Sequence, residues 1–399
     1  MHALTDDGRG ARHPLLLVAA MLALVGALLL GLGAGDADAK KAKKPKFGAM
    51  TMNVYLGADL TPILQANNVN SAVDAGGEIA NQVDRTNFPV RAQALAQEIL
   101  STRPDLVGLQ EVALWRTQPT NAAAITTPSA TNVEYDFLDL LLKELNKSGT
   151  NYEAVVVKQE FDAEFPVNDD TSDGQQGLAG ADHNERLTMR DVILRRVDSK
   201  AKVSNPNSGT FATLLQVSVA QGVATFDVTR GWTAVDVKLK GTKQFRFVNT
   251  HLEAFDSSGQ NTTNTGQSLG RGQIRAAQAA ELVAAGGPAN TPGTDVLVGD
   301  INSDDDTVQP NGDQLAYNTL VSAGLLERTT ANPLGCCLDD PNLVQPGGFD
   351  HQVDHILTDN KKVKLKGSQV LGLSPVNGLF PSDHAAISSK LQMPPKKKK

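Results

Sequence analysis

Polar residues that could bind a cation or move a proton follow several short apolar runs in this chain. The clearest case is VLVGDINSDDD at residues 296–306, where a glycine is followed by Asp300, Asn302 and three further aspartates. Asp300, Asn302 and Asp304 alternate as at the start of an EF-hand loop, which also needs Gly at its sixth position and Glu at its twelfth. Asp and Asn stand at those two positions here. We therefore reject an EF-hand and interpret the run as a buried strand that ends in Gly-Asp-x-Asn.

Similar residues stand at the ends of other strand-like runs. The set is Asn53 in MTMN, Glu111 in DLVGLQE, His251 in FVNTH, Asp300 and Asn302 in VLVGDIN, Asp354 in QVDHIL, and Asp383 with His384 in FPSDHAAI. Hydrolysis of a phosphodiester needs a cation on the charged oxygens, donors aimed at the developing charge, and a group that orients water. This set contains residue types that suit each of the three tasks.

In its order and spacing, the set resembles the endonuclease/exonuclease/phosphatase superfamily. Its members include deoxyribonucleases, apurinic endonucleases, inositol phosphatases and bacterial sphingomyelinases. A lone SDH or GDxN occurs by chance, but six fragments in the family's order are a strong signal that covers nearly the whole chain after residue 46. The resemblance implies an α/β fold of the α+β type: a four-layer sandwich of two packed mixed β-sheets with helices on the outer faces.

The resemblance also implies a divalent metal site. Hard oxygen ligands suit Mg²⁺, with Mn²⁺ as a substitute. Glu111 would be the first ligand, Asn53 would lie beside the same ion, and Asp383 would contribute to the site. The two cysteines, Cys336 and Cys337, are adjacent. They cannot join distant segments, and both a vicinal disulfide and two free thiols remain open.

Catalytic roles follow from the same resemblance. Asp300 would activate or orient the attacking water, and Asn302 would donate to the same group or to a phosphate oxygen. His251 and His384 would donate to non-bridging oxygens, and Asp354 would hold the His384 ring in orientation. Taken singly, each residue also has a structural interpretation, such as a hydrogen-bonded core histidine or a surface acid.

Several neighbouring polar residues are placed outside the site. We expect His355 to play no part, Arg190 and Asp191 to form an ion pair on an edge strand, and Asp304 to Asp306 to lie in a solvated loop. Gln352 stands two residues before Asp354, where the family often has an arginine. This departure removes a support that Asp354 would otherwise have.

The strand-like and helix-like runs alternate as in a mixed α/β protein. Predicted strands lie within 47–56, 106–112, 152–159, 191–197, 232–240, 245–252, 295–302, 353–359 and 385–393, and predicted helices within 90–104, 135–149 and 271–287. Residues 116–134 and 163–188 are polar and rich in glycine or asparagine. We expect them to form long loops.

The ends of the chain differ from its body. Residues 1–39 resemble a signal peptide, since an apolar run follows two arginines and leads to ADA; an uncleaved membrane anchor is the alternative. A basic linker at 40–46, a catalytic domain at 47–393 and a basic tail at 394–399 would follow. Removing residues 1–39 takes away two basic and four acidic groups, which changes the formal charge from −7 to −5. Nine lysines lie in the two tails, so the folded body is near −14.

These observations predict an exported, magnesium-dependent phosphoesterase that forms a monomer. An acidic body argues against broad non-specific binding of nucleic acid, so we expect phospholipid head groups or small phosphodiesters as substrates. An extracellular nuclease and a catalytically inactive binding module are the alternatives. The lysine tails are expected to be solvated ends, with weak tethering to anionic surfaces as the other interpretation.

Overall fold

Two β-sheets form the centre of the protein. The computed structural model describes residues 44–396 except 257–258, 305–313 and 331–332. The larger sheet has the order β19-β20-β1-β2-β6-β3-β4, and β5 also pairs with β6. Its strands are β1 (Lys46–Asn53), β2 (Leu106–Gln110), β3 (Leu114–Pro119), β4 (Asn132–Asp136), β5 (Tyr152–Val167), β6 (His183–Arg196), β19 (Lys364–Leu371) and β20 (Ala386–Gln392). Within it β1 and β2 are parallel, while the other neighbouring strands pair antiparallel.

The smaller sheet has the order β15-β18-β14-β11-β10-β7. Its strands are β7 (Lys202–Thr210), β10 (Gly231–Lys238), β11 (Phe245–His251), β14 (Asp295–Asp300), β15 (Leu326–Glu327) and β18 (Asp354–Thr358). Here β11 and β14 are parallel, so each sheet contains one parallel pair among antiparallel neighbours. Buried Val, Ile, Leu and Phe dominate its central strands β11, β14 and β18, as expected for strands covered on both faces, whereas the edge strand β7 is largely exposed.

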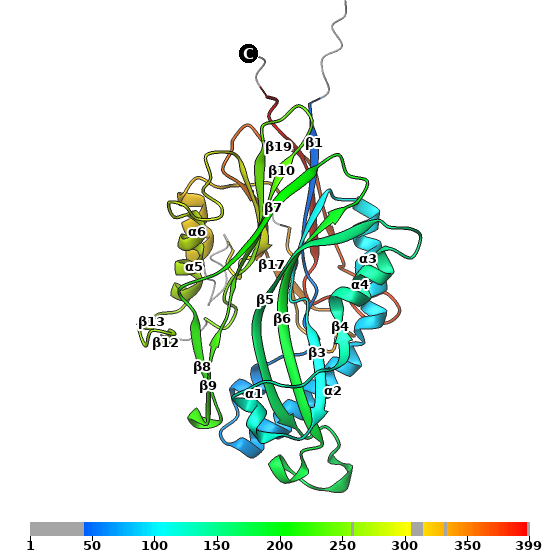
Figure 1. Ribbon diagram of the computed structural model, residues 1–399, viewed down its shortest axis with the longest axis vertical. Coiled ribbons are helices and arrows are strands. Elements are labelled where there is room, and N and C mark those ends of the chain that lie inside the picture. Colours follow the sequence, from blue (N-terminus) through cyan, green and yellow to red (C-terminus); the bar gives the residue numbers. More distant parts are fainter. Residues whose placement is uncertain (1–43, 257–258, 305–313, 331–332, 397–399) are drawn as a thin grey trace, which may run out of the picture. The chain divides into compact units, whose positions relative to one another are not determined.

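Helices cover the outer faces of both sheets (Figure 1). They are α1 (Thr61–Leu64), α2 (Val69–Thr86), α3 (Phe88–Thr102), α4 (Phe137–Leu145), α5 (Gln273–Val283) and α6 (Leu315–Ser322). One apolar cluster joins α2, α3 and α4 to the larger sheet, and a second joins α5 and α6 to the smaller sheet. A third lies between the sheets and includes Phe47, Phe247 and Val298. The predicted four-layer sandwich is therefore confirmed.

Short elements complete the described chain. They are the strand pairs β8 (Leu215–Val219) with β9 (Ala224–Val228), β12 (Asn261–Thr262) with β13 (Ser268–Leu269) and β16 (Cys336–Leu338) with β17 (Gly348–His351), and the 3-10 turns Ala122–Ile125, Thr171–Asp173, Gly177–Gly180 and Ala220–Gly222. Among the described residues, no helix is long and apolar enough to cross a membrane. The predicted signal peptide at 1–39 lies outside the described residues.

Every predicted strand and helix is present, but the prediction of two long loops is wrong over much of their length. Strand β5 continues to Val167 and pairs there with His183 at the start of β6. Strands β3 and β4 also occupy both ends of the segment 116–134. These strands can contain polar residues because oppositely charged side chains on neighbouring strands form ion pairs. Arg186 Nη2 on β6, for example, lies 2.6 Å from Asp162 Oδ2 on β5. Cross-strand ion pairs stabilise strands that lack an apolar pattern.

The two sheets approach each other closely at Gly108 on β2. A Cβ atom at this position would lie 2.4 Å from Asn249 Oδ1 and 2.6 Å from Val298 Cγ2, both of which project from the smaller sheet. Such distances are well below van der Waals contact, so a side chain here would push the sheets apart or force Asn249 out of its buried hydrogen bonds.

We predict that Gly108→Ala lowers the free energy of unfolding by about 1–3 kcal/mol, the usual cost of overpacking a core. Gly367→Ala is the matched control, because a Cβ atom on β19 at that position would meet no atom within 4 Å. Urea unfolding followed by circular dichroism measures both variants. Equal stability of the two variants would show that the close sheet contact does not constrain the fold.

Candidate active site

Strand register brings the predicted site residues to one edge of both sheets. On the larger sheet Asn53, the last residue of β1, is in register with Gln110, the last residue of β2. On the smaller sheet Asp300 at the end of β14 is in register with His251 on one side and Asp354 on the other. The carboxyl ends of parallel strands meet at the same edge, which is why residues far apart in sequence become neighbours here.

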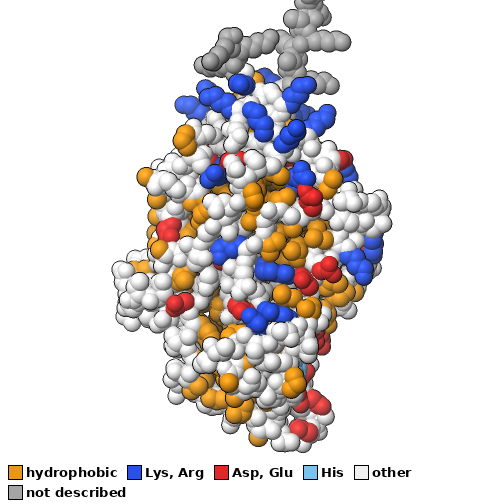
Figure 2. Space-filling model, in the orientation of Figure 1, with side chains coloured by type: hydrophobic (Ala, Val, Ile, Leu, Met, Phe, Trp, Pro, Cys, Tyr) orange, Lys and Arg blue, Asp and Glu red, His pale blue; other side chains and the backbone are white. Residues whose placement is uncertain are grey.

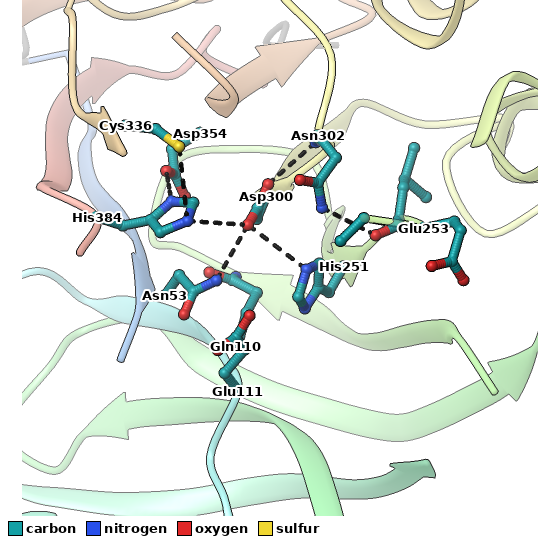
Figure 3. A network of polar contacts seen from close by, with 12 residues as sticks. Asn53, Gln110, Glu111, His251, Glu253, Asp300, Asn302, Cys336, Asp354 and His384 are labelled. Atoms are coloured by element: carbon teal, nitrogen blue, oxygen red, sulfur yellow. Dashed lines mark hydrogen bonds and ion pairs between the residues drawn. The ribbon is translucent and has the colours of Figure 1, made fainter. Parts of the chain in front are cut away.

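Asp300 lies at the centre of the cluster (Figure 3). Its Oδ2 accepts a hydrogen bond from Asn53 Nδ2 at 3.0 Å, and its Oδ1 accepts one from the backbone N–H of Asn302 at 3.0 Å. The Nε2 atoms of His251 and His384 lie 3.5 and 3.7 Å from Oδ2. Burial acts to raise the pKa of Asp300, but the two histidines and both hydrogen bonds together hold it below its usual value. The carboxylate is therefore ionised at neutral pH.

His384 is held between two carboxylates. Its Nδ1 lies 2.7 Å from Asp354 Oδ2, and its Nε2 points toward Asp300. Burial opposes protonation, yet Asp354, Asp300 and Asp383 raise the pKa of His384 well above its usual value. Burial in turn raises the pKa of Asp354 to about 6, and among the described residues its Oδ1 has no hydrogen-bond partner. The pair fixes the His384 ring with Nε2 facing the cluster.

The two adjacent cysteines lie beside the same ring. Cys336 and Cys337 form a disulfide, and the Sγ atom of each is 3.7 Å from His384 Nε2. The sequence left both the disulfide and the free thiols open, and the structure contains the disulfide. The pair therefore forms part of the wall around His384.

His251 has the opposite protonation state from His384. Arg230 Nη1 lies 3.0 Å from His251 Nδ1, and a guanidinium can only donate, so Nδ1 accepts and the ring proton is on Nε2. Burial and then the charge of Arg230 lower the pKa of His251 to about 3. Arg230 itself is 1% exposed, with its Nε 3.8 Å from Glu253 Oε2. His251 is thus a neutral donor that faces Asp300.

Glu111 and Asp383 line a cleft beside this cluster. The cleft has a volume of about 360 Å³, and Tyr55, Leu56 and Asp59 form part of its wall. Glu111 has a left-handed backbone with φ 57°, and its Oε2 accepts a hydrogen bond from the Leu56 N–H at 2.8 Å. Such a conformation costs on the order of 1 kcal/mol in a non-glycine residue and is common at functional sites.

The donor set of this cleft fits a hard divalent cation. Burial and then the charge of Asp383 raise the pKa of Glu111, and burial also raises the pKa of Asp383. A cation would favour the charged form of both groups and so reverse these shifts. Among the described residues, two groups of three ligand atoms lie within 4.8 Å of one another: Asp300, Asp354 and His384 form one, and the cysteine pair with His384 forms the other. In the first group, Asp354 and His384 already contact each other at 2.7 Å.

Asn302 contributes mainly through its backbone. Its N–H donates to Asp300, while its side-chain Nδ2 donates to the Leu252 carbonyl at 3.0 Å. Its carbonyl oxygen accepts a hydrogen bond from Arg275 Nη1. Asn302 therefore ties the end of β14 to the end of β11 and to α5.

Arg91 on α3 holds together the segments that carry the site residues. The sequence did not indicate this role. Its buried guanidinium donates to four carbonyls: those of Val54 and Tyr55 after β1, of Thr86 at the end of α2, and of Pro381 before Asp383. Removal of one hydrogen-bonded buried group leaves its partners unsatisfied. A helix arginine in a sequence gives no signal of such a role, because its partners are backbone atoms.

Some polar residues lie elsewhere than the sequence indicated. The edge-strand ion pair of Arg190 with Asp191 is wrong: β6 is an interior strand, Arg190 pairs with Asp136 at 2.6 Å, and Asp191 is buried. Asp304 is also buried, with Oδ2 3.4 Å from His351 Nδ1, so it is not solvated. Asp305 and Asp306 lie outside the described residues.

His355 lies outside the cluster, as expected. Its Nδ1 is 2.7 Å from Glu327 Oε2, and its Nε2 is 3.1 Å from the Ser303 carbonyl. Gln352, which replaces the family's arginine, has its Nε2 3.4 Å from His355 Nδ1. Gln352 therefore contacts the imidazole of His355, whose charge acts to lower the pKa of Asp354.

Comparison with known proteins gives several similar solved structures and one family match. Solved structures similar to the chain include an endonuclease/exonuclease/phosphatase family protein from Bacteroides thetaiotaomicron (15% identity over 88% of this chain and 99% of that one, TM-score 0.48). A mannosyl-6-phosphatase from the same organism matches at 19% identity (86% and 99%, TM-score 0.45), and D. rerio TDP2 complexed with a single-strand DNA product at 15% (87% and 98%, TM-score 0.47). At these values they say nothing about substrate, and no curated protein sequence matches. The model of the endonuclease/exonuclease/phosphatase family, however, matches residues 50–384, and the chain belongs to that family.

Proposed function

We propose that this protein is an exported, magnesium-dependent phosphoesterase that hydrolyses phosphodiester bonds. Family membership supports cleavage of phosphoester bonds in general. The observation that carries the more specific proposal is the position of Asp300, an ionised buried carboxylate with two imidazole Nε2 atoms within 3.7 Å. Such a group can orient a water molecule and accept its proton during attack on phosphorus.

The two histidines would stabilise the developing charge in different ways. His384 is protonated and would donate a charged hydrogen bond, while His251 is neutral and would donate through its Nε2–H. Asp354 keeps the His384 ring in place, and Arg230 keeps the His251 tautomer fixed. A phosphoryl oxygen that lay near both rings would meet two preorganised donors.

Glu111, Asp383 and Asn53 are the residues that would hold the cation. When bound, Mg²⁺ would draw charge from the phosphate oxygens and so lower the barrier to attack. Glu111 is anchored by the Leu56 N–H, and Asn53 is anchored by Asp300. These ligands would come from the ends of β1 and β2 and from the segment before β20.

The distribution of charge supports a small substrate. Figure 2 shows lysine and arginine side chains gathered at the end of the protein where β1 begins. Lys46 is the first residue of β1, and Lys238 is the last residue of β10. The site lies at the other end of both strands, where Asn53 ends β1 and Gly231 begins β10 in register with His251. A duplex-binding nuclease needs several lysine or arginine side chains around its cleft to neutralise the DNA phosphates. We therefore favour phospholipid head groups or small phosphodiesters, and keep an extracellular nuclease as the alternative.

We predict that purified protein hydrolyses bis(p-nitrophenyl) phosphate in the presence of Mg²⁺, and that Asp300→Asn and His384→Ala each lower kcat by at least about 100-fold. Asp350→Asn, at a largely exposed carboxylate, and His183→Ala, at a histidine at the far end of β6, are the controls. Circular dichroism checks that all four variants fold. Near-normal rates in both folded site variants would refute the assignment.

A second prediction concerns Arg230. In Arg230→Met the pKa of His251 should rise from about 3 but stay below its ordinary value near 6.5, because the charge of Arg230 is gone while burial, the larger cause, still opposes protonation. His251 should therefore remain neutral at pH 7. NMR titration of the imidazole measures the shift in pKa.

Arg246→Met is the matched control, because Arg246 pairs with Asp236 on the neighbouring strand and away from the cluster. An unchanged pKa for His251 in folded Arg230→Met would contradict the assigned tautomer.

A further inference from the structure

An apolar cavity lies next to the catalytic cleft. Its volume is about 80 Å³, and it is enclosed by α1, α2, the long strands β5 and β6, and the β8–β9 hairpin. Phe161, Phe165 and Phe226 line it. The Phe226 ring packs edge-on against the other two, with ring centroids 6.2 Å from Phe161 and 5.3 Å from Phe165. Figure 2 shows hydrophobic side chains at the surface in the lower part of the protein, where Figure 1 places these elements.

The lining of the cavity is mostly apolar. Glu185 and Arg230 are the only charged residues among the described residues that line it, and Arg230 Nη1 contacts His251. Protein interiors are otherwise close-packed, and apolar cavities of this kind stay dry and take up apolar ligands. An apolar space of this size can therefore hold a hydrocarbon group.

The cavity and the catalytic cleft share part of their walls. Leu60 and Phe255 line both spaces, and the carboxylates Glu111 and Asp383 line only the cleft. Arg230 also links the cavity to the Asp300 cluster, because it lines the cavity and its Nη1 lies 3.0 Å from His251 Nδ1. A phosphoester bound in the cleft therefore has an apolar space next to it.

We propose that this cavity is a subsite for an alkyl or acyl chain carried by the phosphoester substrate. This inference rests on the proposed phosphoesterase function and narrows its substrate class to amphiphilic phosphoesters. The occupant is a hydrocarbon chain and not a nucleobase, because a buried base would leave its polar edge without partners in a wall of this composition.

Alkyl phosphates of increasing length test the subsite. Binding of methyl, butyl and hexyl phosphate to the full chain in the presence of Mg²⁺ is measured by calorimetry. Each buried methylene strengthens apolar binding about three- to fourfold, so butyl phosphate should bind at least about tenfold more tightly than methyl phosphate. Equal affinities for the three ligands would overturn the inference.

Two variants locate the effect. Ala163 on β5 is buried and lines the cavity, so Ala163→Phe fills the space, whereas Val157→Phe on the same strand adds the same ring at a position that is 47% exposed. Only Ala163→Phe should abolish the dependence on chain length while methyl phosphate binds as before. If this variant does not fold, Phe226→Ser on the half-buried hairpin strand tests the same wall. Retained chain-length dependence in the folded variants would place the subsite elsewhere and overturn the assignment.

Hydrolysis of bis(p-nitrophenyl) phosphate and of plasmid DNA by the same preparation separates the two proposals. Hydrolysis without chain-length dependence leaves the phosphoesterase function and rejects the subsite. Chain-length dependence without any hydrolysis rejects the phosphoesterase function, and with it the identification of the occupant as a substrate group. Rapid cleavage of plasmid together with equal alkyl phosphate affinities would favour a nuclease and overturn the inference.

Discussion

The site depends on one buried negative charge. Asp300 is 1% exposed, and a carboxylate in such a place is stable only if its surroundings compensate for the lost water. Asn53, the Asn302 N–H and two imidazoles provide that compensation, and they come from both sheets. The same contacts leave the carboxylate ionised and surrounded by hydrogen-bond donors. The contacts that stabilise the buried charge of Asp300 are therefore the same ones that place hydrogen-bond donors around it.

This charge requires the two sheets to be held in fixed register. Gln110 Nε2 on β2 donates to Asn249 Oδ1 on β11 at 2.6 Å, and the side-chain amide of Asn249 donates back to the Leu109 carbonyl. Gly108 permits this approach because it has no side chain. Gln110 is in register with Asn53, and Asn249 stands two residues before His251 in β11. A shift of one sheet against the other would separate Asn53 from Asp300 and remove one of the hydrogen bonds that compensate the charge.

The sequence predicted the parts of this arrangement that follow local patterns. Apolar runs that end in Asn53, Glu111, His251 or Asp300 became strands, because burial on both faces requires such runs. Arg230 could not be found in the same way. It stands one residue before β10, and only the antiparallel pairing of Gly231 with His251 brings it to the imidazole.

Tertiary contacts also explain the helix α2, which the sequence analysis missed. Its segment contains Gly76 and Gly77, which lower intrinsic helix propensity. A Cβ atom at Gly77 would lie 1.7 Å from the Asn168 carbonyl oxygen, so packing against the end of β5 requires glycine there. The extension of β5 itself depends on pairs such as Asp162 with Arg186, which join residues distant in sequence. These features belong to the assembled fold and not to any single segment.

The most direct test of the account is cation binding by metal-stripped protein. Calorimetric titration with Mn²⁺ should show binding to the wild type, and Glu111→Gln should weaken it by at least about tenfold, because loss of a ligating carboxylate removes a charged oxygen from the site. Glu144→Gln, at a carboxylate on α4 that is paired with Lys147, should bind as the wild type does. Absence of binding in the wild type, or equal affinity in Glu111→Gln, would contradict the proposal that this cleft holds the catalytic metal.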